Sequence, residues 1–218
     1  MVEISRARRL RLGIDVGGTN TDAALLRGKE VLATAKSFTT ADVRSGVVSA
    51  VTRILECSGV DRGAIEAVMI GTTQFVNAFV QRRDLAPVAI LRVSLPKADG
   101  VPPLAAWPDD VAAGVGGGIY MVRGGALYTG GDYAPLDEDA IRVAALDARA
   151  KGLKAVAISA NFSPIRPDLE RRAGAIFREV LPDGLITLSS DVGGLGLIDR
   201  ESAAIINASL AGLASRTI

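Results

Sequence analysis

One glycine-rich segment near the N-terminus indicates the architecture of this protein: Gly13-Ile14-Asp15-Val16-Gly17-Gly18-Thr19-Asn20-Thr21-Asp22. Alternating apolar residues over 10–16 predict a strand, Gly17 and Gly18 predict a tight turn, and residues 19–26 predict a second strand beside the first. A further turn at 27–29 and a third strand at 30–37 complete a predicted antiparallel three-strand meander.

The meander, followed by alternating helices and strands, decides between two fold classes. Helical periodicity over 42–58, with Asp42 as the expected N-cap, precedes alternating elements: strand 67–71, helix 73–82, strand 88–93, helix 137–151, strand 155–159, a helix opened by Pro167, strand 185–189 and helix 199–213. In a doubly wound dinucleotide-binding fold the first strand runs directly into a helix. We therefore predict an α/β protein with a ribonuclease-H-like mixed sheet, a three-strand antiparallel meander and helices on both faces.

The predicted organisation is one domain preceded by a short tail. Residues 1–9 form a basic N-terminal tail, and residues 10–218 form the ribonuclease-H-like domain. Proline and glycine are frequent between 94 and 135. We expect an irregular insertion there, carrying a hairpin turned at Gly124-Gly125.

Composition excludes several classes of function. The 218 residues include no histidine and one cysteine, so histidine-based triads, cysteine clusters for metals and internal disulfides are excluded. We expect a cytoplasmic protein. Lys and Arg number 25 against 24 Asp and Glu, and aromatic residues make up 4%, which disfavours nucleic acid as a partner. No apolar run reaches about 18 residues, so no membrane span is predicted.

The segment 13–22 has the residues of a phosphate-binding turn. Asp15 ends a strand, where it can hold magnesium through water, and Gly17 and Gly18 let backbone N–H groups approach phosphate oxygens. Thr19 and Thr21 add hydroxyl groups. A plain hairpin with a Gly-Gly turn is the alternative. Asp15 and Asp22 are the carboxylates nearest the turn, and they are the candidates for proton transfer.

A second candidate site begins where the strand 67–71 ends. Thr72 and Thr73 stand at the start of the next predicted helix, where unpaired N–H groups suit an anionic or carbonyl-bearing ligand. The alternative is that Thr72 is a simple N-cap. Other polar residues surround the start of the last helix. They either act as caps and exposed ion pairs or face a cleft. We expect the first for all but Asn207, that is, for Asp191, Asp199, Arg200 and Glu201.

Four segments resemble the hydantoinase/oxoprolinase family, in the N-terminal region of the hydantoinase A type. They are residues 13–22, Ile70-Gly71-Thr72-Thr73-Gln74-Phe75-Val76-Asn77-Ala78-Phe79-Val80-Gln81-Arg82-Arg83, Asn161-Phe162-Ser163-Pro164 and residues 199–208. The first segment is shared with the superfamily of actin and the sugar kinases, and the second narrows the resemblance to the family.

The resemblance implies an ATP-dependent enzyme that uses Mg²⁺ to activate and open a cyclic amide, such as a hydantoin or 5-oxoproline. It places Asp15, near the metal, in the first phosphate-binding turn with Gly17, Gly18, Thr19, Asn20 and Thr21. It also assigns five residues to the floor of the cleft, of which the last is the weakest candidate: Gly71, Thr72, Thr73, Asn77 and Arg82.

The resemblance further implies that other protein parts complete the enzyme. These are a second ATP-binding domain of the same family and a hydantoinase B type subunit, so the chain alone is expected to be incomplete and inactive. An isolated half would expose an apolar face and self-associate. Two alternatives stay open: a sugar or small-molecule kinase of the same superfamily, and a non-catalytic scaffold subunit with half a nucleotide site.

Overall fold

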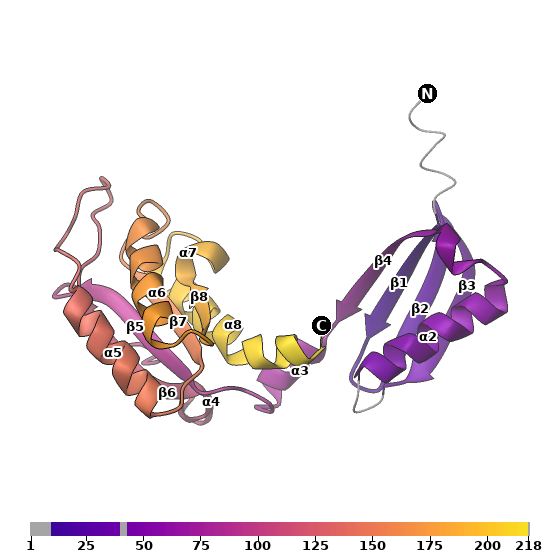
Figure 1. Cartoon of the computed structure of the whole chain (residues 1–218), viewed down its shortest axis with the longest axis horizontal. Helices are drawn as coiled ribbons and strands as arrows, with labels where there is room; N and C mark the ends of the chain where they lie inside the picture. Colours follow the sequence, from indigo (N-terminus) through magenta and orange to yellow (C-terminus); the bar gives the residue numbers. More distant parts are fainter. Residues whose placement is uncertain (1–9, 40–42, 218) are drawn as a thin grey trace. The chain divides into compact units, whose positions relative to one another are not determined.

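The computed structural model describes residues 10–39 and 43–217. The chain forms two compact units, of which the first ends at Val80 and the second runs from Gln81 to Arg216. Each unit has a four-stranded sheet of its own (Figure 1). The span 10–218, predicted as one domain, is thus resolved into these two units, while the predicted basic tail and the expected N-cap Asp42 lie outside the described residues.

The first unit contains a mixed sheet. Strands β1 (Leu10–Val16), β2 (Asn20–Arg27) and β3 (Glu30–Phe38) form the antiparallel meander, and β4 (Ile65–Thr72) pairs in parallel with β1, in the order β3-β2-β1-β4. Helix α2 (Val43–Ser58) lies across one face (Figure 1). The 3₁₀ turn η1 (Arg62–Ala64) precedes β4, and helix α3 (Gln74–Val80) follows it. The predicted α/β class, mixed sheet and meander are confirmed.

Side-chain alternation gives this sheet a covered face and an open face. Leu12, Ile14 and Val16 of β1 are buried in one cluster with Ala50 and Ile54 of α2. Successive side chains on a strand point to opposite faces, so the residues between these three point away from α2. Asp15 is therefore displayed on the open face.

The second unit is a parallel sheet with helices on both faces. Its strands are β5 (Val88–Leu95), β6 (Gly116–Arg123), β7 (Ala155–Ala160) and β8 (Leu185–Leu188), in the order β6-β5-β7-β8. Its helices are α4 (Asp109–Val115), α5 (Glu138–Ala150), α6 (Asp168–Val180), α7 (Ser189–Val192) and α8 (Leu197–Thr217).

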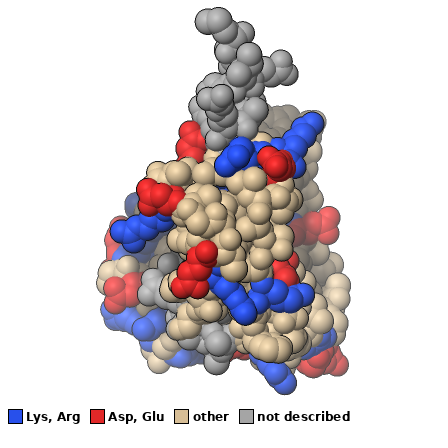
Figure 2. Space-filling view, turned by 90° about the vertical axis from the view of Figure 1, so that its right-hand side faces the viewer, with Lys and Arg blue, Asp and Glu red and all other residues tan. Residues whose placement is uncertain are grey.

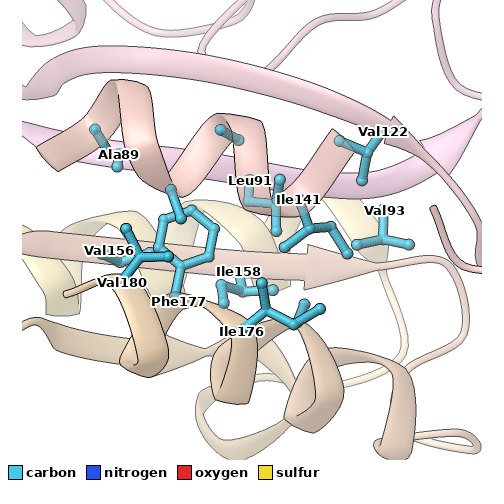
Figure 3. Close-up of a cluster of buried hydrophobic side chains, with 14 of the residues drawn as sticks. Ala89, Leu91, Val93, Val122, Ile141, Val156, Ile158, Ile176, Phe177 and Val180 are labelled. Atoms are coloured by element: carbon cyan, nitrogen blue, oxygen red, sulfur yellow. The ribbon is translucent and has the colours of Figure 1, made fainter. Parts of the chain in front are cut away.

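The two faces of the second sheet have separate cores. Figure 3 shows the larger one, in which Leu91 of β5 and Ile158 of β7 lie with Ile141 of α5 and Ile176 of α6. On the other face, residues of β5 and β7 pack with α4 and α8 through Val115, Ala204, Ile205 and Ala208. Residues of β5 from Val88 to Ser94 are buried throughout, as expected of a central strand covered on both faces.

The expected irregular insertion at 94–135 is wrong in its middle part. That part contains α4 and β6, and β6 pairs in parallel with β5 rather than forming a hairpin at Gly124-Gly125. Three consecutive glycines at 116–118 weaken the strand pattern in the sequence. A larger residue at Gly117 would displace a neighbour, because an added Cβ would lie 2.5 Å from Cδ2 of Leu153.

Charges are mixed on the one face of the molecule that Figure 2 shows. On the face seen in Figure 2, acidic and basic side chains are interspersed around uncharged residues. Within the described ranges 10–39 and 43–217, no helix combines the length and the apolar character needed to cross a membrane.

Candidate functional site

Thr39, the residue after β3, holds the turn between β1 and β2. Its hydroxyl donates to the carbonyl oxygen of Gly17 at 2.8 Å, and its N–H donates to the carbonyl oxygen of Thr19 at 2.9 Å. The N–H of Gly17 donates to the carbonyl oxygen of Asn20 at 2.9 Å. Among the described residues, none accepts a hydrogen bond from the N–H of Gly18 or Thr19. Two backbone donors of a fixed turn are thus available to an anion.

Thr21 is buried and does not present its hydroxyl to solvent beside the turn. It is fully buried, and its hydroxyl lies 3.1 Å from the hydroxyl of Thr39. The sequence grouped Thr21 with the phosphate-binding residues because of its hydroxyl. The burial corrects that assignment: Thr21 supports Thr39, which in turn fixes the turn.

The start of α3 is tied to the same end of β1. The carbonyl oxygen of Val16 accepts hydrogen bonds from the hydroxyl of Thr72 at 3.1 Å and from the N–H of Thr73 at 3.3 Å. The hydroxyl of Thr72 also accepts from the N–H of Gln74 at 3.0 Å, which gives it the capping role of the alternative reading. The first N–H of α3 is therefore already bonded, and the N-terminus of this short helix offers less to an anion than expected.

The two sequence motifs meet at Gly18 and Asn77. A Cβ added at Gly18 would lie 3.4 Å from Nδ2 of Asn77, and that same Nδ2 lies 3.4 Å from the hydroxyl of Thr73. Asn77 is half-buried one turn into α3. The structure thus places an amide donor next to the free N–H groups of the turn, so the segments 13–22 and 70–77 form one site.

The open face of the sheet beside the turn is hollowed. Asp15 pairs with Asp22 on β2 and with Gly71 on β4, and Asp22 pairs with Lys36 on β3, so the four residues form one row across the sheet. All four line a cavity of about 580 Å³, together with Gly13, Ile14, Ala23, Ala24, Thr34, Ala35 and Met69. Small residues here leave room for a ligand over the backbone. Lys36, at 3.3 Å from Asp22, was not predicted.

The donor set in this row fits a magnesium ion that is shared with a phosphate ligand. The described residues contain no group of three or more acidic, cysteine or histidine side chains able to enclose a metal ion. Mg²⁺ characteristically takes one or two carboxylates, and substrate phosphates and water complete its shell. Asp15, exposed at the end of β1, can provide the first carboxylate.

Arg82 belongs to the second unit, unlike the other predicted cleft residues. Its Nε lies 2.8 Å from Oδ2 of Asp110, at the start of α4. The hydrogen bond from Arg82 lowers the pKa of the Asp110 carboxyl group. Both side chains are exposed, so their ion pair contributes little to stability.

Buried charges at the carboxyl ends of β5 and β7 went unrecognised in the sequence. Nε and Nη2 of Arg92 both donate to the carboxylate of Glu201, and the hydroxyl of Ser159 donates to Glu201 at 2.7 Å. Arg92 and Glu201 are almost completely buried. The expectation that Glu201 is a cap or part of an exposed ion pair is therefore wrong.

A second charged group lies beside the first. Arg200 donates to Ser189 at 2.8 Å and to the carbonyl oxygen of Ala160 at 2.6 Å, and Glu170 accepts from Ser189 and from the N–H of Ala160. Arg200 was also expected on the surface, and this too is wrong because it is 1% exposed. Burial lowers the pKa of the Arg200 guanidinium. Two arginines balance two glutamates in a network closed to solvent, which is a structural role.

Comparison with known proteins supports the family resemblance. A family model described as the hydantoinase/oxoprolinase N-terminal region matches residues 11–181. The chain is 30% identical to caprolactamase subunit alpha of Pseudomonas jessenii over 97% of its own length and 32% of that protein.

Two solved structures share the fold. An acetone carboxylase chain matches with a TM-score of 0.77 at 22% identity, over 96% of this chain and 34% of its own. The ATP-dependent caprolactamase of Pseudomonas jessenii matches with a TM-score of 0.72 at 26% identity, over 94% and 32%. The chain thus spans about a third of the length of these relatives. Because the family model covers most of the chain, the protein belongs to the hydantoinase/oxoprolinase family and corresponds to the N-terminal region of that family.

Proposed function

We propose that this chain is the N-terminal, phosphate-binding part of an ATP-dependent enzyme that activates and opens a cyclic amide, such as a hydantoin or a 5-oxoproline-like ring. The supporting observation is the turn at Gly17-Gly18, whose N–H groups at Gly18 and Thr19 are directed to no protein acceptor among the described residues. The caprolactamase relative is ATP-dependent, and its name denotes action on a lactam, which is a cyclic amide.

Each group of residues has a distinct task in this proposal. The N–H groups of Gly18 and Thr19 and the amide of Asn77 bind phosphate oxygens, while Asp15 holds magnesium through water. Thr39 and Thr72 keep the turn and α3 in place. Bound magnesium-ATP supplies a transferable phosphoryl group, which makes an amide carbonyl more reactive toward water.

Other protein parts complete the proposed enzyme. The relative is named as a subunit alpha, which supports a multi-subunit assembly, and this chain spans about a third of it. We propose a second ATP-binding domain of the same family and a hydantoinase B type subunit as the partners, and the cytoplasm as their location. In this proposal the present chain binds nucleotide but does not open the ring alone.

Titration calorimetry with magnesium-ATP tests the phosphate site. We expect the 218-residue chain to bind and the Asp15→Ala variant to lose binding. Asp61→Ala is the matched control, because Asp61 is an exposed carboxylate of the same unit at the start of η1. Absence of binding to the unmodified chain, or equal binding by Asp15→Ala, would contradict the proposed site.

A further inference from the structure

Lys36 is the one cationic side chain among the described residues that line the open-face cavity. It ends the row that runs from Gly71 on β4 through Asp15 and Asp22 to β3. Neighbouring strands are separated by about 4.8 Å, so the backbone of Lys36 lies roughly 10 Å from that of Asp15. A lysine side chain that leans from β3 toward β1 can reach a ligand bound over β2.

The partner of Lys36 does not hold it tightly. Nζ lies 3.3 Å from Oδ1 of Asp22, and the two side chains are 63% and 54% exposed. Such exposed pairs contribute little, so a better anion can replace Asp22. The backbone of Lys36 is nevertheless fixed, because Nη1 of Arg53 on α2 donates to its carbonyl oxygen at 3.1 Å. The backbone of Lys36 is thus bonded to α2, while its side chain is exposed on the open face.

The charges in the cavity explain why a lysine is useful there. Asp15 and Asp22 give the row two negative charges, which would repel phosphate. A divalent magnesium ion at Asp15 would balance the two carboxylates, and the amine of Lys36 at the other end of the row would leave a net positive charge for the phosphate. Lysine binds phosphate as a compact point charge with three donors.

We propose that Lys36 binds a phosphate oxygen of the nucleotide in this cavity and that Asp22 positions its amine there before the ligand arrives. The inference rests on the proposed nucleotide function of the same site. It gives Asp22 a different role from the proton transfer considered for it from the sequence. Asp15 then provides the metal-binding carboxylate of the row.

The test is titration calorimetry of the full chain with magnesium-ATP at several salt concentrations. Lys36→Met is expected to weaken binding about tenfold or more, because a hydrogen bond to a charged group is lost. It is also expected to reduce the salt dependence of the dissociation constant, a change that a purely structural role would not produce. Lys36→Arg should retain most of the affinity, and the unfolding temperature should be unchanged.

Two further variants sharpen the test. Lys29→Met removes an exposed lysine at the turn between β2 and β3, so it controls for the loss of one positive charge and should bind as the unmodified chain does. Asp22→Asn should weaken binding by at most about fivefold, the range of an exposed ion pair. A much larger loss would instead make Asp22 a ligand of the metal or of the nucleotide, and would overturn its positioning role.

The outcomes separate this inference from the proposed function. If the chain binds magnesium-ATP, Asp15→Ala abolishes binding and Lys36→Met leaves it unchanged, the nucleotide site stands and the role of Lys36 is overturned. Equal weakening by Lys29→Met and Lys36→Met would show a general charge effect and would also overturn it. If the unmodified chain does not bind, both the proposed function and the role of Lys36 fail.

Discussion

The hydroxyl of Thr39 lies 2.8 Å from the carbonyl oxygen of Gly17 and 3.1 Å from the hydroxyl of Thr21. A residue beyond the third strand thus fixes the turn between the first two. The contact holds a glycine turn in which the N–H groups of Gly18 and Thr19 have no acceptor among the described residues. It also makes the shape of the candidate site depend on one hydroxyl group.

Thr39→Val should destabilise the first unit by about 1–3 kcal/mol, because it leaves the buried hydroxyl of Thr21 without this partner. The shape of the side chain is nearly unchanged, so the loss reports on the hydrogen bonds. Hydrogen exchange of amides in β1 and β2, followed by mass spectrometry, measures the local free energy of opening.

Two variants control this prediction. Thr39→Ser retains the hydroxyl and should protect the amides almost as well as threonine does. Thr52→Val removes a hydroxyl that bonds to the carbonyl oxygen of Val48 on the exposed side of α2, and should change stability by less than about 0.5 kcal/mol. If the amides of β1 and β2 exchanged at the same rate in Thr39→Val and Thr52→Val, Thr39 would not hold the turn.

Local patterns in the sequence predicted the meander and all the longer helices, but not the short helices α4 and α7. Contacts between distant residues also escaped prediction. Gly17, Gly18 and Gly28 mark turns in the sequence, and alternation defines the strands between them. Thr39 was missed because its role depends on a turn 20 residues earlier. Lys36 escaped prediction because of a bulge: counted from the pair Arg27–Glu30 at the short turn, Ala35 would lie opposite Asp22. The register shift between Leu25 and Leu26 brings Lys36 there instead.

The buried charges were missed for the same reason. Arg200 and Glu201 begin a helix, where polar residues are usually caps, and the partner of Glu201 is Arg92, 109 residues away. No spacing rule connects residues so far apart. The strand β6 escaped notice because glycine is depleted in strands, although the glycine at 117 packs closely against Leu153.

Arg92→Met should destabilise the second unit by about 3–5 kcal/mol, because it leaves Glu201 charged and buried without its partner. Urea unfolding followed by fluorescence measures this, since the protein has one tryptophan, Trp107, and it lies in the second unit. The indole Nε1 of Trp107 donates to Ser202 on α8 at 3.2 Å, so its emission should respond when α8 detaches.

A double variant distinguishes the loss of charge balance from the loss of packing. Arg92→Met combined with Glu201→Leu removes both charges and should recover much of the stability. Arg172→Met breaks the exposed ion pair with Glu138 and should cost less than about 1 kcal/mol. Equal losses for Arg92→Met and Arg172→Met would contradict the structural role of the buried network.

Acid should weaken the second unit through Asp168. The guanidinium of Arg166 donates from Nε and Nη2 to both carboxylate oxygens of Asp168 at 2.8 Å, and this holds the Asp168 pKa below its usual range. A pKa lowered by folding gives stability that is present above the unfolded value, near pH 4, and lost as the pH falls through the folded value. The loss is therefore expected below about pH 4.

Arg166→Gln should reduce that acid dependence. The variant should be less stable than the unmodified chain at pH 6, and the two urea midpoints should converge as the pH falls below about 4. Arg149→Gln, which replaces an exposed arginine near the end of α5, should instead follow the unmodified chain at each pH. A constant difference between Arg166→Gln and the unmodified chain from pH 6 to pH 2.5 would show that Asp168 is not responsible.

The two glycines of the turn should respond differently to alanine, because each is small for a different reason. A Cβ at Gly17 would lie 3.0 Å from the carbonyl oxygen of Asn20, the acceptor that closes the turn, whereas a Cβ at Gly18 would meet only the side-chain amide of Asn77 at 3.4 Å. An amide group can rotate away, but a backbone carbonyl that closes a turn cannot. Gly17→Ala should therefore cost about 1–2 kcal/mol by hydrogen exchange, and Gly18→Ala less than about 0.5 kcal/mol.

The change at Gly18 should affect nucleotide binding more than it affects stability. Its added methyl group would stand between the free N–H groups and Asn77, where we place the phosphate oxygens, so Gly18→Ala should lose magnesium-ATP affinity in titration calorimetry while remaining folded. If Gly18→Ala bound as well as the unmodified chain, the phosphate would not lie between the turn and α3. If it unfolded more readily than Gly17→Ala, the turn would be closed by a different contact.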